Sequence, residues 1–575
     1  MAIQLKSLNL FIFFPFLIFT WPGFQALGIL ATLLSIFYLD LYGRHRFGVP
    51  SVLLLPVVSS FFSGFVGLVL GVNPTLNIKI GFALGAFFLL LFNNGVGTSQ
   101  TNDLQIKIQK SFSIYLIPLL IFIFFASKQS TWLISRFMEG DSRNHALLIE
   151  NIVEKGFVTP SQQGYYPSGY LFMNAVGVNA NFVSSVVLNS VYGIITGFIV
   201  CTLAILVSLH KLSNFLELKN YQSFVVSVAI FSPPILGFIF FNGFWSAYWA
   251  FAILIQVNVL ILTSISDVPK NRTHIGLMCL ILLSYQAWAL ITPTVIVLAL
   301  IYFIRDRKIS LQLNDVILLG LLLIHLSIGF ISFNPAGRSL LEMIKLDGGI
   351  QNLDFVLVCT LYTFFMWLIM SVISFRIYYV AQAILAILFY LLIGSIRLPN
   401  SFDGYYNIKL IWILLFSLTP ILFALFIKHF RSSPGKLAVG FLTGALILNL
   451  SGVSTLSTIS FVTGRSGLNS DQVNALKQLT AEDTAAFWYF TSPPTDRLAT
   501  FWSSYATNPK GDTIVFNEVA TWAYGQTGTE QDFCNLLKMQ PKLRVITKLP
   551  NAVDIIVEKY CPEYLAKYSI YAPDE

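Results

Sequence analysis

Titratable side chains are concentrated at one point of an otherwise apolar region of the chain. Directly after a long apolar stretch, seven positions contain Glu139, Asp141, Arg143 and His145. Ionisable groups beside a membrane span are candidates for function, because placing them there is costly. A carboxylate can take the proton of a hydroxyl nucleophile, and cations can hold a phosphate that leaves. The cluster therefore favours transfer of a group from a phosphate at a membrane surface.

A second cluster lies far later in the chain. Residues 397–409 read Arg-Leu-Pro-Asn-Ser-Phe-Asp-Gly-Tyr-Tyr-Asn-Ile-Lys and precede another apolar stretch. Together the two clusters supply a carboxylate and several cations, which suits transfer of a sugar from a lipid phosphate. We expect Asp141 to act as the base. We expect the donor phosphate to contact Arg143, His145, Arg397, Tyr406 and Lys409, and the sugar to contact Tyr165, Tyr166 and Tyr405.

Each of these residues also has an ordinary structural explanation that the sequence leaves open. Asp141 is suited to capping a helix, and Arg143 to contacting lipid headgroups. Interfacial tyrosines commonly anchor a span, and Lys409 can serve as the same kind of anchor.

The elements that must position the first cluster can be read from apolar spacing. Asp141 is placed to cap a helix whose apolar stripe consists of Ala146, Ile149, Ile152 and Val153. Gly156 is suited to end that helix. The pattern predicts an amphipathic helix that lies on the outer membrane surface.

Composition indicates a membrane protein with one water-soluble part. Of the 575 residues, 56% are hydrophobic and 11% are charged, against about 25% charge in soluble domains. Residues 456–575 contain 23 charged residues in 120 positions, whereas residues 1–455 contain 39 in 455. We therefore expect an all-α polytopic membrane domain over 1–455 and a small extracytoplasmic α/β domain over 456–575.

Apolar stretches of about the length that crosses a bilayer recur along the first domain. They cover 8–22, 24–42, 50–72, 76–95, 112–127, 182–209, 222–241, 247–266, 275–304, 314–333, 354–374, 377–396, 409–428 and 437–455. The 275–304 stretch is too long for one span, and basic residues flank both of its ends. Breaking it between Trp288 and Pro293 into two short helices places both basic groups on one side and gives about 15 spans.

The distribution of Lys and Arg predicts the orientation. With the N-terminus in the cytoplasm, 16 of the 25 Lys and Arg residues of the membrane domain fall on the cytoplasmic side, as the positive-inside rule requires. The loops 128–181 and 334–353 and the tail 456–575 are then extracytoplasmic. The net charge of +8 follows from this loop bias, and we expect no nucleic-acid partner.

The tail has its own pattern of elements. We expect helices over about 471–489 and 530–539, and strands over 513–516, 544–547 and 553–557. Cys534 and Cys561 lie in this exported part, where an oxidising compartment permits pairing. The sequence does not give their Cα separation, so it leaves the disulfide open.

Several well-known motifs do not occur in the chain. The sequence contains no CxxC, HExxH, P-loop or GxGxxG pattern, which disfavours an ATP-driven pump, a thiol oxidoreductase or a zinc protease. No histidine pair has metal-ligand spacing, and we expect no tightly bound metal. A carboxylate site of this kind can still recruit Mg²⁺ or Mn²⁺ through water.

The order of these motifs resembles that of the GT-C-type membrane glycosyltransferases, especially the cell-wall arabinofuranosyltransferase group. The resemblance is carried by residues 140–145, by Gly156, by 166–169 (Tyr-Pro-Ser-Gly, where relatives tend to have Tyr-Pro-Pro-Gly), by Tyr405, Tyr406 and Lys409, and by 515–518 and 522–528 of the tail. Ser168 departs from the group's pattern, which leaves the donor sugar open.

The resemblance implies a polyprenyl-phosphate sugar as donor, an envelope glycan or lipid-linked acceptor, and Asp141 as base, in a multi-pass protein of the cell membrane. Two alternatives stay open. One is a polysaccharide polymerase or ligase that uses lipid-linked pyrophosphate donors. The other is a flippase or transporter of lipid-linked sugars, in which inverted repeats and ionisable residues near the midplane are expected.

Overall fold

The structure is a computed structural model of the whole chain. It describes residues 48–93 except 72, single positions between 117 and 137, and residues 142–158, 169–181, 186–228, 230, 239, 243–266, 270–305, 313–331, 373–396 and 405–430. In the tail it describes 486–489, 515–516, 534–535, 537–538, 544–547, 550–565 and 569–571. The loop 334–353 and the spans expected at 8–22, 24–42 and 437–455 lie outside these residues, as does the span expected at 354–374 except for its last two residues, which begin α18.

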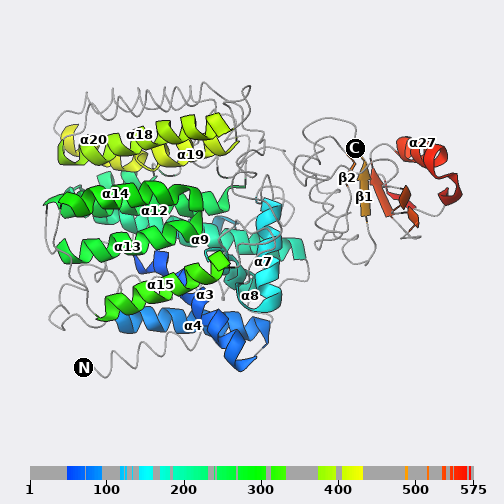
Figure 1. Cartoon of the computed structure of the whole chain (residues 1–575), viewed down its shortest axis with the longest axis horizontal. Coiled ribbons are helices and arrows are strands. Elements are labelled where there is room, and N and C mark those ends of the chain that lie inside the picture. Colours follow the sequence, from blue (N-terminus) through cyan, green and yellow to red (C-terminus); the bar gives the residue numbers. More distant parts are fainter. Residues whose placement is uncertain are drawn as a thin grey trace.

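Helices that run side by side form the main body (Figure 1). They are α3 (Ser51–Leu70), α4 (Pro74–Asn93), α8 (Leu171–Asn181), α9 (Val186–Phe215), α10 (Asn220–Val228), α12 (Trp245–Ser266), α13 (Lys270–Ala287), α14 (Thr292–Arg305), α15 (Leu313–Ile331), α18 (Ile373–Ile396), α19 (Tyr405–Phe416) and α20 (Thr419–Phe430). The central helix is α12, which packs against α9, α13, α18 and α19. Helix α7 (Ser142–Lys155) crosses one end of the bundle (Figure 1).

Four segments among the described residues are long and apolar enough to cross a membrane: Ser51–Val69, Asn189–Phe215, Trp245–Ser264 and Lys409–Phe430. At about 1.5 Å per residue, 20 residues reach the ~30 Å of a hydrocarbon core. The large apolar side chains on the outer faces of α4, α15 and α18 are exposed, as lipid contact requires. The chain is therefore a helical membrane protein, and the count of about 15 spans stays a prediction.

The break expected inside 275–304 is confirmed. Helix α13 ends at Ala287, a short 3-10 turn η2 covers Ala289–Ile291, and α14 begins at Thr292. The His274 ring, near the start of α13, lies 5.4 Å from the Tyr302 ring and 5.2 Å from the Phe303 ring, near the end of α14. The two helices therefore form a hairpin, and the basic residues that flank it lie at the same end of the bundle.

The segment expected as one span over 409–428 contains a break that the sequence analysis missed. Pro420 has no N–H and cannot donate to the carbonyl one turn earlier, so α19 ends at Phe416 and α20 begins at Thr419. In the turn, the Leu418 N–H donates to Leu415 O instead of Leu414 O. The Leu414 carbonyl thus needs another donor.

Gln382 of α18 supplies that donor. Its Nε2 donates to Leu414 O at 2.6 Å and to Ser417 Oγ at 3.2 Å. Asn258 Nδ2 of α12 in turn donates to Gln382 Oε1 at 3.1 Å. All of these side chains are buried. Gln382 and the Ser417 hydroxyl, which also donates to Leu414 O at 2.9 Å, satisfy the broken backbone, and Asn258 holds the Gln382 side chain in place.

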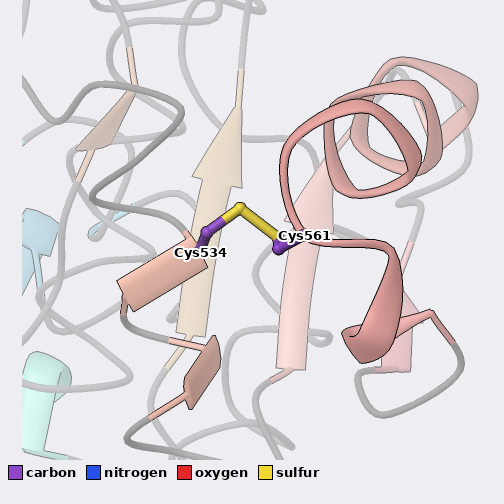
Figure 2. The surroundings of a disulfide bond; sticks show 2 residues. All are labelled: Cys534 and Cys561. Carbon is purple, nitrogen blue, oxygen red and sulfur yellow. A yellow bond between two sulfur atoms is a disulfide. The ribbon is translucent and has the colours of Figure 1, made fainter.

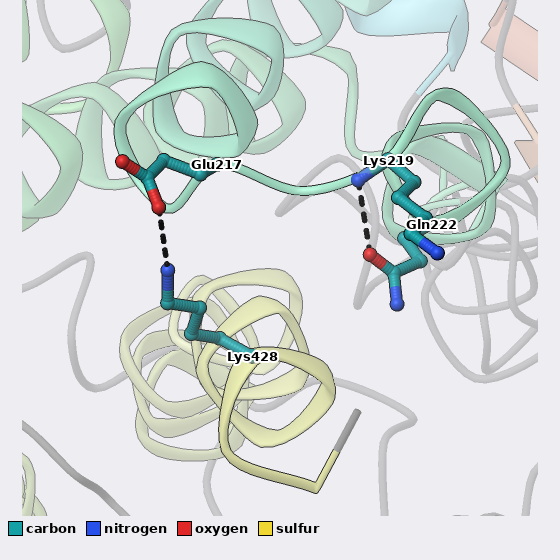
Figure 3. Close-up of polar contacts among 4 residues, drawn as sticks. All are labelled: Glu217, Lys219, Gln222 and Lys428. Carbon is teal, nitrogen blue, oxygen red and sulfur yellow. Dashed lines mark hydrogen bonds and ion pairs between the residues drawn. The ribbon is translucent and has the colours of Figure 1, made fainter. Parts of the chain in front are cut away.

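A polar contact joins the end of α9 to the end of α20 (Figure 3). These helix ends lie at the opposite end of the bundle from α7 (Figure 1). Lys428 Nζ lies 3.3 Å from Glu217 Oε2, and the Lys219 N–H donates to Gln222 Oε1 at 2.9 Å. Glu217 has a φ of 54°, which forms the turn between α9 and α10. The Glu217 side chain is 78% exposed, so the ion pair contributes about 0–1 kcal/mol.

Four short parallel strands lie apart from the helical bundle, beyond the end at which α7 lies (Figure 1). They are β1 (Ala486–Tyr489), β2 (Val515–Phe516), β3 (Arg544–Thr547) and β4 (Ser569–Tyr571), in the order β2-β1-β3-β4. Helix α27 (Pro550–Tyr560) connects β3 to β4, as parallel strands require.

Two expectations for the tail are wrong in detail. Residues 486–489, expected as the end of a helix, form β1, and residues 553–557, expected as a strand, belong to α27. In α27, Val553 and Val557 are buried whereas Ile555 between them is 62% exposed. The buried positions thus recur every fourth residue, as in a helix, although the local sequence is rich in β-branched residues.

Cys534 and Cys561 form a disulfide (Figure 2). Their Cα atoms are 5.8 Å apart, and 27 positions separate them in the sequence. In the chain-entropy model, closing a loop of this length stabilises the folded state by about 3.5 kcal/mol. The bond joins the residue after α27 to a segment that precedes β3.

Candidate functional site

Helix α7 begins and ends where the sequence predicts. It covers Ser142–Lys155, directly after Asp141. Gly156 has a φ of +80°, and a Cβ there would lie 2.7 Å from Pro74 Cα, so only glycine fits. The Gly156 carbonyl accepts a hydrogen bond from Ser63 Oγ of α3. This contact fixes the end of α7 on the bundle.

The apolar face of α7 contacts protein, which corrects the expectation that it faces the membrane. Ala146, Ile149 and Ile152 belong to the same buried cluster as the bundle helices, and α7 packs against α4, α8 and α9. Ser142, the residue after the predicted base, and His145, about one turn after it, are also fully buried. The start of α7 is therefore part of a protein interior and not of a surface helix.

Lys409 lies inside the protein at the start of a membrane-spanning segment. Its side chain is 1% exposed. The Nζ atom lies 3.7 Å from the centre of the Phe244 ring and 5.4 Å from the centre of the Trp288 ring. Aromatic faces attract a cation, more strongly when it is desolvated. A lysine that anchors a span at the headgroups would reach water instead, so this alternative does not fit Lys409.

His145 and Lys409, predicted as phosphate ligands from separate clusters, lie close enough to interact electrostatically. Burial, and secondly the positive charge of Lys409, lower the pKa of His145 to about 3. At pH 7 the imidazole of His145 is therefore neutral. It can offer a hydrogen bond to a ligand, and Lys409 supplies the positive charge.

Trp245 and its neighbour Phe244 link the start of α7 to Lys409. The Trp245 Nε1 donates a hydrogen bond to Ser142 Oγ at 2.9 Å, and Phe244 contacts Lys409. Trp245 thus links Ser142 of α7 to Phe244, and Phe244 contacts Lys409 of α19, which lies within electrostatic range of His145 on α7. We call these five residues the α7–Lys409 site.

The Tyr-Pro-Ser-Gly motif ends inside the bundle, whereas the sequence analysis expected a surface loop over 128–181. A Cβ at Gly169 would lie 2.7 Å from Gln286 Oε1 of α13. Tyr170 Oη donates to Leu53 O of α3 at 3.2 Å, and its ring stacks on Trp249 at 4.4 Å. Helix α8, which follows, is largely buried against α9. This part of the loop is therefore a helix packed within the bundle.

The remaining predicted ligands are placed only in part. Arg143 lies in the first turn of α7, and Tyr405 and Tyr406 lie in the first turn of α19, one turn before Lys409; the structure describes their backbone only. The other predicted residues lie outside the described part of the chain: Asp141, Tyr165, Tyr166 and Arg397.

Sequence reasoning missed Phe244 and Ser142. Phe244 directly follows an Asn-Gly turn at the start of a span, where aromatic residues are common as anchors. Residue type therefore does not separate a ring that holds a lysine from an ordinary membrane anchor.

No metal centre is seen in the part of the chain that the structure describes, since no three His, Cys, Asp or Glu side chains gather there. The groups that the site offers are the buried ammonium of Lys409, the neutral imidazole of His145, the hydroxyl of Ser142 and the aromatic side chains around them. Such a site can bind an anion and orient a polar ligand in surroundings of low dielectric constant.

We expect His145 to make the stability of the protein depend on pH. Its pKa is lower in the folded than in the unfolded state, so the unfolded state binds more protons between about pH 3 and 6.5. The folded state should therefore lose stability as the pH falls below about 6.5. Thermal unfolding from pH 7.5 to 4.5 should show a smaller loss for His145→Gln than for the wild type, and exposed His429→Gln serves as the control. Equal losses would contradict the buried position of His145.

No protein-family model matches the chain, and no characterised protein and no solved structure matches it. The function must accordingly be argued from the residues of the site itself.

Proposed function

We propose that this protein is a membrane glycosyltransferase of the GT-C type. It moves a sugar from a polyprenyl-phosphate donor to an envelope glycan or a lipid-linked acceptor on the extracytoplasmic face of the cell membrane. The observation that carries the proposal is that His145 and Lys409, from the two segments that the sequence assigned to phosphate binding, are both buried and lie within electrostatic range of each other, with Lys409 against the Phe244 ring. The donor sugar stays open because of Ser168, and arabinofuranose is the candidate that the resemblance to the arabinofuranosyltransferase group suggests.

The reaction needs one proton transfer and one displacement. The acceptor hydroxyl oxygen forms a bond to the anomeric carbon of the donor as the bond from that carbon to the phosphate oxygen breaks. The hydroxyl proton passes to the Asp141 carboxylate. The polyprenyl phosphate leaves with an additional negative charge, and the Lys409 ammonium stabilises that charge.

The aromatic surroundings of Lys409 suit this role. Phe244 and Trp288 exclude water from the ammonium, and an electrostatic attraction to phosphate is stronger where water is excluded. Their rings attract the cation without cancelling its charge. His145, being neutral, would donate or accept a hydrogen bond at the phosphate or the sugar.

Two further observations support the proposed sidedness. The basic loops of the α13–α14 hairpin lie at the same end of the bundle, as the charge distribution requires if that end is cytoplasmic. The Cys534–Cys561 disulfide is typical of an oxidising, extracytoplasmic compartment. We accordingly propose about 15 membrane helices, a cytoplasmic N-terminus and an extracytoplasmic α/β domain over 456–575.

Cysteine labelling tests this orientation. Cysteines that replace exposed Glu154 of α7 and exposed Asp554 of α27 should react with a membrane-impermeant maleimide in intact cells whose outer layers admit it. A cysteine that replaces Glu217, which is 78% exposed at the other end of the bundle, should react only after the membrane is permeabilised. If only the cysteine at position 217 were labelled in intact cells, the protein would have the opposite orientation in the membrane.

A transfer assay tests the function. The purified protein in lipid nanodiscs is mixed with radiolabelled polyprenyl-phosphate sugars and an envelope glycan acceptor, with polyprenyl-pyrophosphate sugars in parallel. The proposal expects a labelled glycan and free polyprenyl phosphate from the monophosphate donors. Transfer from the pyrophosphate donors alone would indicate a polymerase or ligase. Movement of the donor across a liposome membrane without any product would indicate a transporter.

A further inference from the structure

Two neighbouring residues at the start of α12 contact both halves of the α7–Lys409 site. Trp245 contacts the first residue of α7, and Phe244 contacts the ammonium of Lys409. We propose that Phe244 and Trp245 are positioning residues that together set the distance between the base at the start of α7 and the cation that holds the phosphate. This inference rests on the proposed function.

The backbone fixes this pair in place. Gly243 has a φ of +64° and turns the chain into α12. The Phe244 N–H donates to Ile239 O at 3.0 Å, and the Trp245 N–H donates to Gly243 O at 3.0 Å. The Phe244 carbonyl accepts from the Tyr248 N–H, also at 3.0 Å, in the first turn of the helix. Both side chains therefore start from a rigid helix end.

Two neighbouring aromatic rings also confine the Trp245 ring. Phe137 stacks on it at 5.8 Å between ring centres, and Phe198 of α9 meets it edge-on at 6.3 Å. With the ring confined in this way, the direction of its Nε1–H bond to Ser142 is fixed. Ser142 is joined by a peptide bond to Asp141, so a displacement of Ser142 moves the proposed base with it.

Phe244 acts on the other half of the site. It is fully buried, and its ring lies under the Lys409 Nζ at 3.7 Å, with Trp288 nearby at 5.4 Å. A ring in this position confines the ammonium and so determines where its positive charge lies. Because Phe244 and Trp245 are adjacent, the phosphate-binding cation and the start of α7 share one rigid support.

Single substitutions separate the two contacts. Trp245→Phe keeps a ring but removes the donor, Ser142→Ala removes the acceptor, and the double variant combines them. Trp249→Phe is the matched control, because Trp249 lies one turn further along α12 and stacks on Tyr170. For Trp245→Phe and Ser142→Ala we expect kcat to fall roughly three- to tenfold with an unchanged donor KM, as the loss of one hydrogen bond allows. Phe244→Leu should instead raise the donor KM.

The double variant and a second measurement decide the inference. If the hydrogen bond is the link, the double variant should be no slower than either single variant. Hydrogen–deuterium exchange of the first two turns of α7 should be faster in Trp245→Phe and Ser142→Ala, and unchanged in Trp249→Phe. Additive kinetic losses, or equal exchange in all variants, would overturn the positioning role. A wild-type protein that transfers no sugar would overturn the proposed function alone, because the exchange experiment would still test the link to α7.

Discussion

Asp141→Asn should reduce sugar transfer to below one tenth of the wild-type rate while leaving expression and folding intact. The amide of asparagine can still cap α7, but it cannot take the proton of the acceptor hydroxyl. General-base catalysis contributes roughly 10²- to 10⁴-fold, so the loss should appear in kcat. The rate is measured with the purified variant in nanodiscs and a radiolabelled polyprenyl-phosphate sugar.

Glu154→Gln is the matched control for this variant. Glu154 lies near the end of α7, the helix that follows Asp141 in the sequence, and is exposed to solvent. The same change of carboxylate to amide there should leave transfer near the wild-type rate. An Asp141→Asn protein that kept more than a tenth of the activity would remove Asp141 from the role of base.

Lys409→Met should weaken donor binding and slow the chemical step together. The ammonium contacts the phosphate in the bound lipid and stabilises it as it leaves, and a charge-assisted hydrogen bond contributes about 1.5–3 kcal/mol. The expected loss in kcat/KM is therefore about 10- to 150-fold. Transfer rates over a range of donor concentrations, together with donor-lipid binding, give both effects.

Lys409→Arg and Lys428→Met test whether the position and the shape of the cation matter. Arginine keeps the charge, but its planar fork is larger and meets phosphate with a different geometry, so only part of the activity should return. Lys428→Met removes a lysine from the opposite end of the same apolar segment, where it pairs with Glu217, and it should leave transfer unchanged. Unchanged donor binding in Lys409→Met would separate the 397–409 segment from the site.

The parts of the fold that the sequence predicts well are those governed by local rules. The start of α7 directly after Asp141, its apolar stripe and its end at Gly156 follow from residue preferences at helix starts, helical spacing and the freedom of glycine to adopt a positive φ. The α13–α14 break follows from length and from the positions of basic residues. In each case a single short stretch of sequence contains the whole signal.

Features that depend on contacts between distant segments were missed. The apolar stripe of α7 fits lipid and protein equally well by composition, and only the neighbouring helices decide that it is buried in the bundle. The chain returns into the helical bundle at Gly169 and Tyr170 because these residues pack against α3 and α13. In α27, the tertiary position of Val553 and Val557 determines a helix in spite of strand-forming residues.

The candidate site was likewise predictable from the sequence only in part. The types and spacing of residues identified His145 and Lys409, and the structure brings these two together. The sequence could not show that His145 is neutral, because burial by other segments causes its lowered pKa. It also could not assign Phe244 or Ser142 to the site, because their roles arise from contacts with α19 and α12.

A structure of the protein with a polyprenyl phosphate bound tests the central claim most directly, because it shows where the phosphate lies. We expect the phosphate within about 4 Å of the Lys409 Nζ, with Asp141 and the first turn of α7 on the side where the sugar would be attached. A phosphate bound at the opposite end of the bundle, near Glu217 and Lys428, with Lys409 still against the Phe244 ring, would contradict the proposed site.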